Sequence, residues 1–194
     1  MPRSPKKSIR RISVLGSGKV REKDPTYQQA VKLGQALARE GVTVFHGGFG
    51  GVMEAVAKGS RLAGGKNVGV IIRSTPLRPG LCRGKDRVLI RAQRWTDIEV
   101  ATSSWQSRLF KLIEKGDAYI FLDGATGTLN ELFFVWEMAN KGLHAKPIIL
   151  LGKRLHMLVK FLKKDPALKI PSCFYLEPSI ARVIKVLKGV ERGA

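Results

Sequence analysis

One stretch of the chain decides the fold, residues 42–55, which read VTVFHGGFGGVMEA. An apolar run, Val42–Phe45, leads into a glycine-rich turn, Gly47–Gly51, and a helical pattern follows over Val52–Ala63. Short runs that are apolar throughout are typical of parallel strands covered on both faces. The stretch therefore predicts a strand, a tight turn and a helix, the unit from which doubly wound α/β folds are built.

Similar units stand on either side of this stretch. Residues 12–18 read ISVLGSG, and Asp24 followed by Pro25 predicts a helix start, because Asp is a good N-cap and Pro suits the first helical position. Residues 118–131 read AYIFLDGATGTLNE, an apolar run that leads through a turn into a helix. The other expected strands are Val68–Ile72, Val88–Ile90, Ile148–Leu151 and Cys173–Leu176, and the other expected helices are Ile98–Lys115, Leu155–Leu162 and Pro178–Leu187. The predicted fold class is α/β, a single doubly wound, Rossmann-like parallel sheet with helices on both faces.

The domain organisation follows from length and composition. With 194 residues the chain has the length of one domain, which we place at residues 11–190, after a basic, disordered tail at 1–10. No apolar run approaches the roughly 20 residues of a membrane helix, and no apolar segment of a signal peptide follows the basic start. Cys82 and Cys173 fit neither a disulfide framework nor a zinc cluster. A cytoplasmic protein without a metal site is expected.

The net charge of +20 is the unusual feature of the composition. It indicates an anionic partner, such as a nucleotide or a nucleic acid, or else a surface rich in Lys and Arg for stability alone. The cations are spread over several segments, and no arginine-rich RNA motif or helix-turn-helix pattern is present. A phosphorylated small molecule is therefore the expected partner, ahead of nucleic acid.

Three glycine-rich turns, at 16–18, 47–51 and 124–127, are predicted to join strands to helices. In doubly wound folds such turns lie at the carboxyl ends of the strands, where ligands bind. Glycine lets a ligand approach the backbone, and a helix N-terminus favours phosphate. The turns lack the P-loop pattern, and Arg21 stands where a dinucleotide fingerprint has its third glycine.

These residues also carry a resemblance to a known family. Residues 47–55, GGFGGVMEA, with residues 64–71, GGKNVGVI, resemble the first half of the Rossmann-like LOG phosphoribohydrolases, often mislabelled lysine decarboxylases. Residues 124–131 resemble the second signature of that family, Pro-Gly-Gly-x-Gly-Thr-x-x-Glu, and Arg108 matches its helix arginine. The wording GGVMEA is most similar to the branch that contains molybdenum-cofactor carrier proteins. The resemblance covers about residues 11–151.

The resemblance implies hydrolysis of the N-glycosidic bond of a nucleoside 5′-monophosphate. Glu131 would assist the attacking water, and Arg108 would lie beside the scissile bond or the phosphate. The residues implied to bind phosphate and nucleotide are Gly16, Ser17, Gly47, Gly48, Gly50, Gly51, Met53, Gly124, Ala125, Thr126, Gly127 and Thr128. A homo-oligomer without a required cofactor is implied.

The alternative is a non-catalytic carrier or sensor of a phosphorylated ligand, such as molybdenum cofactor or a nucleotide. Three departures from the family pattern favour it. Asp123 stands where the signature has Pro, Ala125 replaces its second Gly, and Leu109 replaces the usual Lys after the arginine.

Each candidate residue also has a purely structural reading. Glu131 would complete a capping box with Thr128, which stabilises a helix start without any ligand. Arg108 would be a solvated charge on a helix. The other candidates with a packing or local-turn reading are Ser17, His46, Met53, Glu54, Trp95 and Trp105. For the two tryptophans the functional reading is a platform on which a base stacks.

Overall fold

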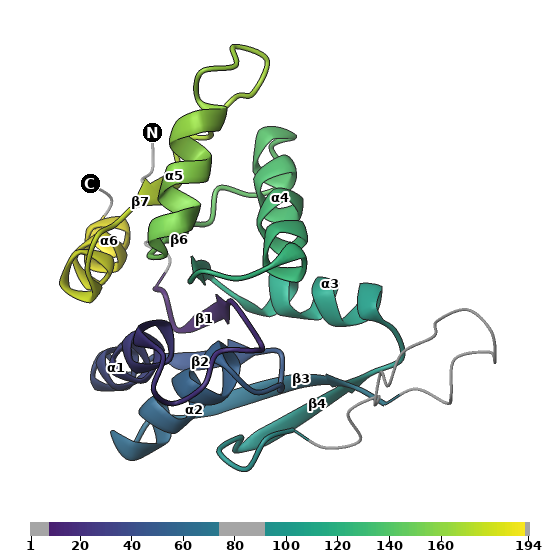
Figure 1. The fold of residues 1–194 in the computed structure, drawn as a ribbon, viewed down its shortest axis with the longest axis vertical. Helices are drawn as coiled ribbons and strands as arrows, with labels where there is room; N and C mark the ends of the chain where they lie inside the picture. The colour runs from purple at the N-terminus through teal and green to yellow at the C-terminus, as the bar shows by residue number, and fades with distance from the viewer. Residues whose placement is uncertain (1–7, 74–91, 193–194) are drawn as a thin grey trace, which may run out of the picture.

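A computed structural model describes residues 8–73 and 92–192 of the chain (Figure 1). The strands are β1 (Arg11–Leu15), β2 (Thr43–His46), β3 (Asn67–Ile72), β4 (Ile98–Thr102), β5 (Ala118–Phe121), β6 (Ile148–Leu150) and β7 (Phe174–Leu176). The helices are α1 (Pro25–Arg39), α2 (Val52–Leu62), α3 (Trp105–Lys115), α4 (Thr126–Asn140), α5 (Lys153–Leu162) and α6 (Ile180–Arg192). The expected strand at Val88–Ile90 and residues 1–7 of the expected tail lie outside the described residues.

The strands form one sheet in the order β4-β3-β2-β1-β5-β6-β7, and all neighbouring strands run parallel. The chain first builds the sheet outward from β1 to β4 and then returns to add β5, β6 and β7 on the other side of β1. The order therefore reverses between β1 and β5, the position at which doubly wound sheets open a ligand crevice. The predicted fold class is confirmed.

Helices cover both faces of the sheet, as alternation along the strands requires. On one face, Ile12 and Ile120 point into a core that α1, α2 and α6 cover. On the other, Tyr119 and Phe121 point into a second core, covered by α3, α4 and α5. Figure 1 shows α1 and α2 together, well apart from α3 and α4.

The helix expected over Ile98–Lys115 is wrong in its first part. Residues Ile98–Thr102 form the edge strand β4, paired with β3, and the helix begins only at Trp105. β-Branched side chains recur at every second position from Ile98, which suits a strand. Ser104 then starts the helix, since its hydroxyl accepts a hydrogen bond from the Ser107 amide at 3.0 Å.

The other helix starts are closer to expectation. Asp24 is the N-cap of α1, and its carboxylate accepts a hydrogen bond from the Thr26 amide at 2.7 Å. Within the expected tail, Ile9 is buried in the core and its N–H donates to the Glu191 carboxylate at 2.9 Å. Residue 9, within the expected tail, is therefore part of the folded domain. None of the helices in residues 8–73 and 92–192 is both long and apolar enough to cross a membrane.

Candidate functional site

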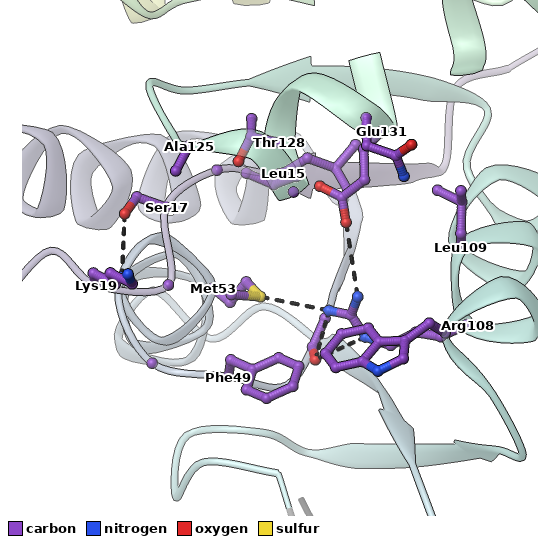
Figure 2. Close-up of a pocket in the computed structure, with 18 of the residues that line it drawn as sticks. Leu15, Ser17, Lys19, Phe49, Met53, Arg108, Leu109, Ala125, Thr128 and Glu131 are labelled. Atoms are coloured by element: carbon purple, nitrogen blue, oxygen red, sulfur yellow. Dashed lines mark hydrogen bonds and ion pairs between the residues drawn. The ribbon is translucent and has the colours of Figure 1, made fainter. Parts of the chain in front are cut away.

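A pocket of about 560 Å³ opens where the sheet order reverses, at the carboxyl ends of β1 and β2 and the N-terminal turns of α2, α3 and α4 (Figure 2). Ten of the predicted site residues line it: Gly16, Ser17, Gly47, Gly50, Met53, Arg108, Ala125, Gly127, Thr128 and Glu131. The predicted residues that do not line it are Gly48, Gly51, Gly124 and Thr126. All three glycine-rich turns therefore contribute to a single pocket.

Arg108 is buried, so the interpretation of this residue as a solvated charge on a helix is wrong. Only 5% of the residue is exposed, and its guanidinium donates to the carbonyl of Gly47 at 2.9 Å and to that of Val70 at 3.0 Å. Burial lowers the pKa of this guanidinium. Two backbone carbonyls hold the side chain, and its remaining nitrogen, Nη1, faces Glu131.

The Arg108 guanidinium occupies the space that a side chain at position 47 would need, which explains why this residue is glycine. A Cβ at this position would collide with the guanidinium and approach the Met53 sulfur to 2.8 Å. The glycine-rich turn after β2 thus holds the arginine as well as opening the pocket. In Figure 2 the Met53 sulfur also points at the guanidinium, from which it lies 3.7 Å.

Glu131 faces Arg108 across the pocket. Its Oε1 lies 3.7 Å from Nη1 of Arg108, and its side chain is 15% exposed. Burial raises the pKa of this carboxyl to about 7, against the opposing effect of the arginine. A carboxyl group that titrates near neutrality inside a pocket has the properties of a general acid or base.

The capping-box reading of Glu131 is wrong. Helix α4 begins at Thr126, and its N-cap is Ala125, whose side chain accepts no hydrogen bond. Thr128 is then the third residue of the helix and cannot serve as its N-cap. The carboxylate of Glu131 is therefore not explained by helix capping.

Asp123, one of the three departures from the family pattern, points away from the pocket. Its carboxylate accepts hydrogen bonds from the amides of Arg154 and Leu155 at 3.2 and 3.1 Å. It thereby caps α5, whose own N-cap is Gly152; a Cβ at Gly152 would collide with the Asp123 carboxylate. The negative charge of Asp123 is therefore directed at the first amides of α5, and not at the neighbouring turn, where it would oppose anion binding.

Two other candidates have structural partners. His46 is fully buried between the Asn67 side chain and the Gly48 amide, and burial lowers its pKa to about 4. Ser17 lines the pocket, yet its hydroxyl accepts a hydrogen bond from the Lys19 amide within its own turn. The packed reading of His46 and the local-turn bond of Ser17 are both confirmed.

Several lining residues were not predicted, namely Val14, Leu15, Lys19, Phe49, Gln106, Leu109 and Asn130, while Gly18 of the first turn and Trp105, which the sequence offered as a stacking platform, also line the pocket. Phe49 and Trp105 stack with ring planes 4° apart and centroids 5.7 Å apart. Phe49 stands inside the glycine-rich turn, so an aromatic residue among four glycines was the available signal. Lys19, an exposed residue, lines the pocket beside Ser17 (Figure 2).

The described residues offer no obvious metal centre. In residues 8–73 and 92–192, no three His, Cys, Asp or Glu side chains are grouped so that they could hold a metal ion. Among these residues, the cations that line the pocket are Lys19 and Arg108, against the single carboxylate of Glu131. The lining therefore suits an anionic organic ligand.

This chain is similar to a known family and to known proteins over most of its length. The family model described as the SLOG cluster4 family matches residues 9–173. An uncharacterized protein of Archaeoglobus fulgidus is 30% identical over 76% of this chain and 87% of its own length. A Mycobacterium tuberculosis protein named cytokinin riboside 5′-monophosphate phosphoribohydrolase is 33% identical over 62% of this chain, but the match spans only 59% of that relative.

A solved structure is similar over 96% of this chain. The Moco carrier protein of Chlamydomonas reinhardtii has a TM-score of 0.70 at 21% identity, over 96% of this chain and 99% of that one. At this identity the likeness establishes the fold.

Proposed function

Since this chain belongs to the SLOG cluster4 family of LOG-like proteins, we propose that it hydrolyses the N-glycosidic bond of a nucleoside 5′-monophosphate. The observation that carries the proposal is the carboxyl group of Glu131. It is buried in the pocket 3.7 Å from Arg108, with its pKa raised to about 7. A carboxylate with this pKa accepts a proton from water at neutral pH more readily than an ordinary glutamate does.

The ligand's phosphate would lie at the first turn of α4. The amides at a helix start lack partners within the helix, and Ala125 offers them no side-chain acceptor. Nothing would lie within 4 Å of a Cβ at Gly127, so a ligand has room to approach the backbone there. Lys19 adds a positive charge at the mouth. These features favour a phosphate monoester over a neutral nucleoside.

In the proposed reaction, water attacks the anomeric carbon of the ribose and the bond from that carbon to the base nitrogen breaks. The Glu131 carboxylate accepts the proton from water, while the base leaves with the bonding electrons and takes a proton from solvent. The sugar develops positive charge as the bond breaks, and the carboxylate stabilises that charge. Arg108 orients Glu131 and limits the pKa rise that burial causes.

A direct assay tests this function. The protein is incubated with adenosine, guanosine, cytidine and uridine 5′-monophosphates, and free base and ribose 5-phosphate are measured by chromatography. We expect the two products in equal amounts from at least one nucleotide. Binding of the nucleotides without any release of base would overturn the hydrolase.

The alternative is a carrier of a phosphorylated ligand such as molybdenum cofactor. The fold is compatible with it, since the Chlamydomonas carrier has the same fold along 99% of its chain. Ala125 and Leu109, which depart from the family signature, both line the pocket. A carrier would retain its ligand unchanged, so mass spectrometry of the ligand recovered after binding separates the two functions.

A further inference from the structure

An aromatic pair forms one wall of the pocket. Phe49 lies in the turn between β2 and α2, and Trp105 is the first residue of α3. Their stacked rings have a centroid distance of 5.7 Å, within the ~4.5–7 Å of direct aromatic pairs. No third ring fits between them, so a ligand would meet the outer surface of the pair.

Both rings are fixed from the protein side. The Arg108 guanidinium carbon lies 5.1 Å from the centre of Phe49 and 5.6 Å from that of Trp105, at cation–π distance. The backbone of Trp105 is set by the reciprocal hydrogen bonds between Ser104 and Ser107. The wall is therefore built in advance of ligand binding.

Trp105 nevertheless remains 57% exposed. Trp136, by contrast, is buried in the core with 4% exposed. Leaving a large aromatic ring exposed to water beside a pocket is unfavourable. A ligand ring stacked on it would remove that surface from water and so gain binding free energy. Packing alone, one of the two interpretations that the sequence left open for this residue, does not account for its exposure.

The position of this wall relative to the proposed phosphate site leaves room for a sugar between the two. In Figure 2, Ser17 and Lys19 lie on one side, Arg108 lies on the opposite side, and Phe49 forms the wall facing Ala125 and Thr128. A phosphate at the first turn of α4 and a ring on the Phe49–Trp105 pair would leave the sugar between them. Glu131 and Arg108 lie beside that intermediate position.

We propose that the Phe49–Trp105 pair is the recognition surface for a flat nitrogen heterocycle, of the purine or pterin class, in the phosphorylated ligand. This inference rests on the proposed function for the phosphate end of the ligand. It assigns ligand specificity to stacking, so a sugar phosphate without a ring system would bind much more weakly. The proposal holds whether the protein hydrolyses its ligand or only carries it, because both functions need the ring of the ligand to be bound.

Binding measurements on Trp105→Leu and Trp105→Phe test the proposal. Calorimetry is carried out with adenosine 5′-monophosphate, with neopterin monophosphate and with ribose 5-phosphate, which lacks the ring. We expect Trp105→Leu to weaken binding of the two ring-bearing ligands by about 10-fold or more, and that of ribose 5-phosphate by less than about 2-fold. Trp105→Phe keeps a π face and should retain most of the affinity.

The matched control is Phe110→Leu, another exposed aromatic residue on α3, which packs edge-on against Phe134 outside the pocket. It should leave all three affinities unchanged. Equal weakening of ring-bearing and ring-free ligands by Trp105→Leu, or no weakening at all, would overturn the stacking role. Wild-type protein that binds ribose 5-phosphate as tightly as the nucleotide would overturn stacking while the phosphate site stands. If none of the three ligands binds, both the stacking role and the proposed phosphate site are overturned.

Discussion

The helix starts of α2 and α4 differ from those of α1, α3 and α5 in how their first amides are satisfied. Asp24 caps α1, Ser104 caps α3, and Asp123 reaches across to cap α5. By contrast α2 and α4, which start at the pocket, have Gly51 and Ala125 as N-caps and no side-chain hydrogen bond. Helix α3 also starts at the pocket, where it is capped and presents the Trp105 ring, whereas the start of α4, where the phosphate is proposed, offers its first amides no side-chain acceptor.

The omission has a cost in folding stability and a benefit in binding. A missing cap costs about 1 kcal/mol, and the unpaired amides add to the positive end of the helix dipole. An anion at that end supplies the missing acceptors. Local rules of helix design are thus broken at the pocket, where function would explain the exception.

The largest expected effect separates a reactive carboxyl group at the pocket from an ordinary one on the same helix. Glu131→Gln removes the negative charge and the basicity, so base release should fall about 10²-fold or more while nucleotide binding survives. Glu137→Gln, at an exposed site on α4, is the matched control and should keep wild-type turnover. A fully active Glu131→Gln protein would remove this residue from the mechanism.

The same substitution should change how stability depends on pH. The pKa of Glu131, at about 7, is above its ordinary value of 4.5, so the folded protein binds more protons than the unfolded chain between these values. Wild-type stability therefore falls as pH rises through this window, and Glu131→Gln should abolish that loss, about 1–3 kcal/mol by pH 8. Denaturant unfolding at pH 4.5, 6 and 8 measures it. Parallel pH profiles would contradict the raised pKa.

The capped side of the comparison is tested at Asp123. Asp123→Ala leaves two amides of α5 without an acceptor and should cost about 1–2 kcal/mol of unfolding free energy. Asp123→Asn keeps one of the two acceptor oxygens and should cost about half as much, roughly 0.5–1 kcal/mol. Because the carboxylate points away from the pocket, nucleotide affinity of the Asn variant should equal that of wild type. A tighter complex would show that its charge acts on the site.

The smallest effect comes from adding the missing cap. Ala125 has the extended backbone of an N-cap, so Ala125→Ser should stabilise the protein by about 0.5–1 kcal/mol. The new hydroxyl would compete with the phosphate for the same amides, and nucleotide affinity should fall several-fold. Thermal unfolding and calorimetry measure the two changes. If stability and affinity rise together, the first turn of α4 is not the phosphate site.

The fold was largely predictable because its signals are local. Apolar strands, glycine turns and caps such as Asp24 recur in order along the sequence. The error at Ile98–Thr102 arose at an edge strand, where four of the five residues are at least partly exposed and the apolar pattern is weak. β-Branching at alternate positions was the better guide there.

The candidate site was predictable only in part, because its key contacts join distant segments. The turns were predicted from the glycine pattern, and Arg108 and Glu131 from the resemblance. That Arg108 is held by Gly47 and Val70 depends on packing across the sheet, which a single sequence does not encode locally. Likewise the partner of Asp123 belongs to a helix some thirty residues later, and nothing near Asp123 in the sequence indicates it.

The guanidinium of Arg108 fills the space where residue 47 would carry its Cβ. These two positions, 61 residues apart in sequence, therefore cannot vary independently. Any side chain at 47 would displace the arginine from the two carbonyls that hold it, and a shorter residue at 108 would leave a void beside the turn. Among related chains, glycine at the first position and arginine at the second should be gained and lost as a pair. Their joint presence would then mark which distant homologues have kept this pocket.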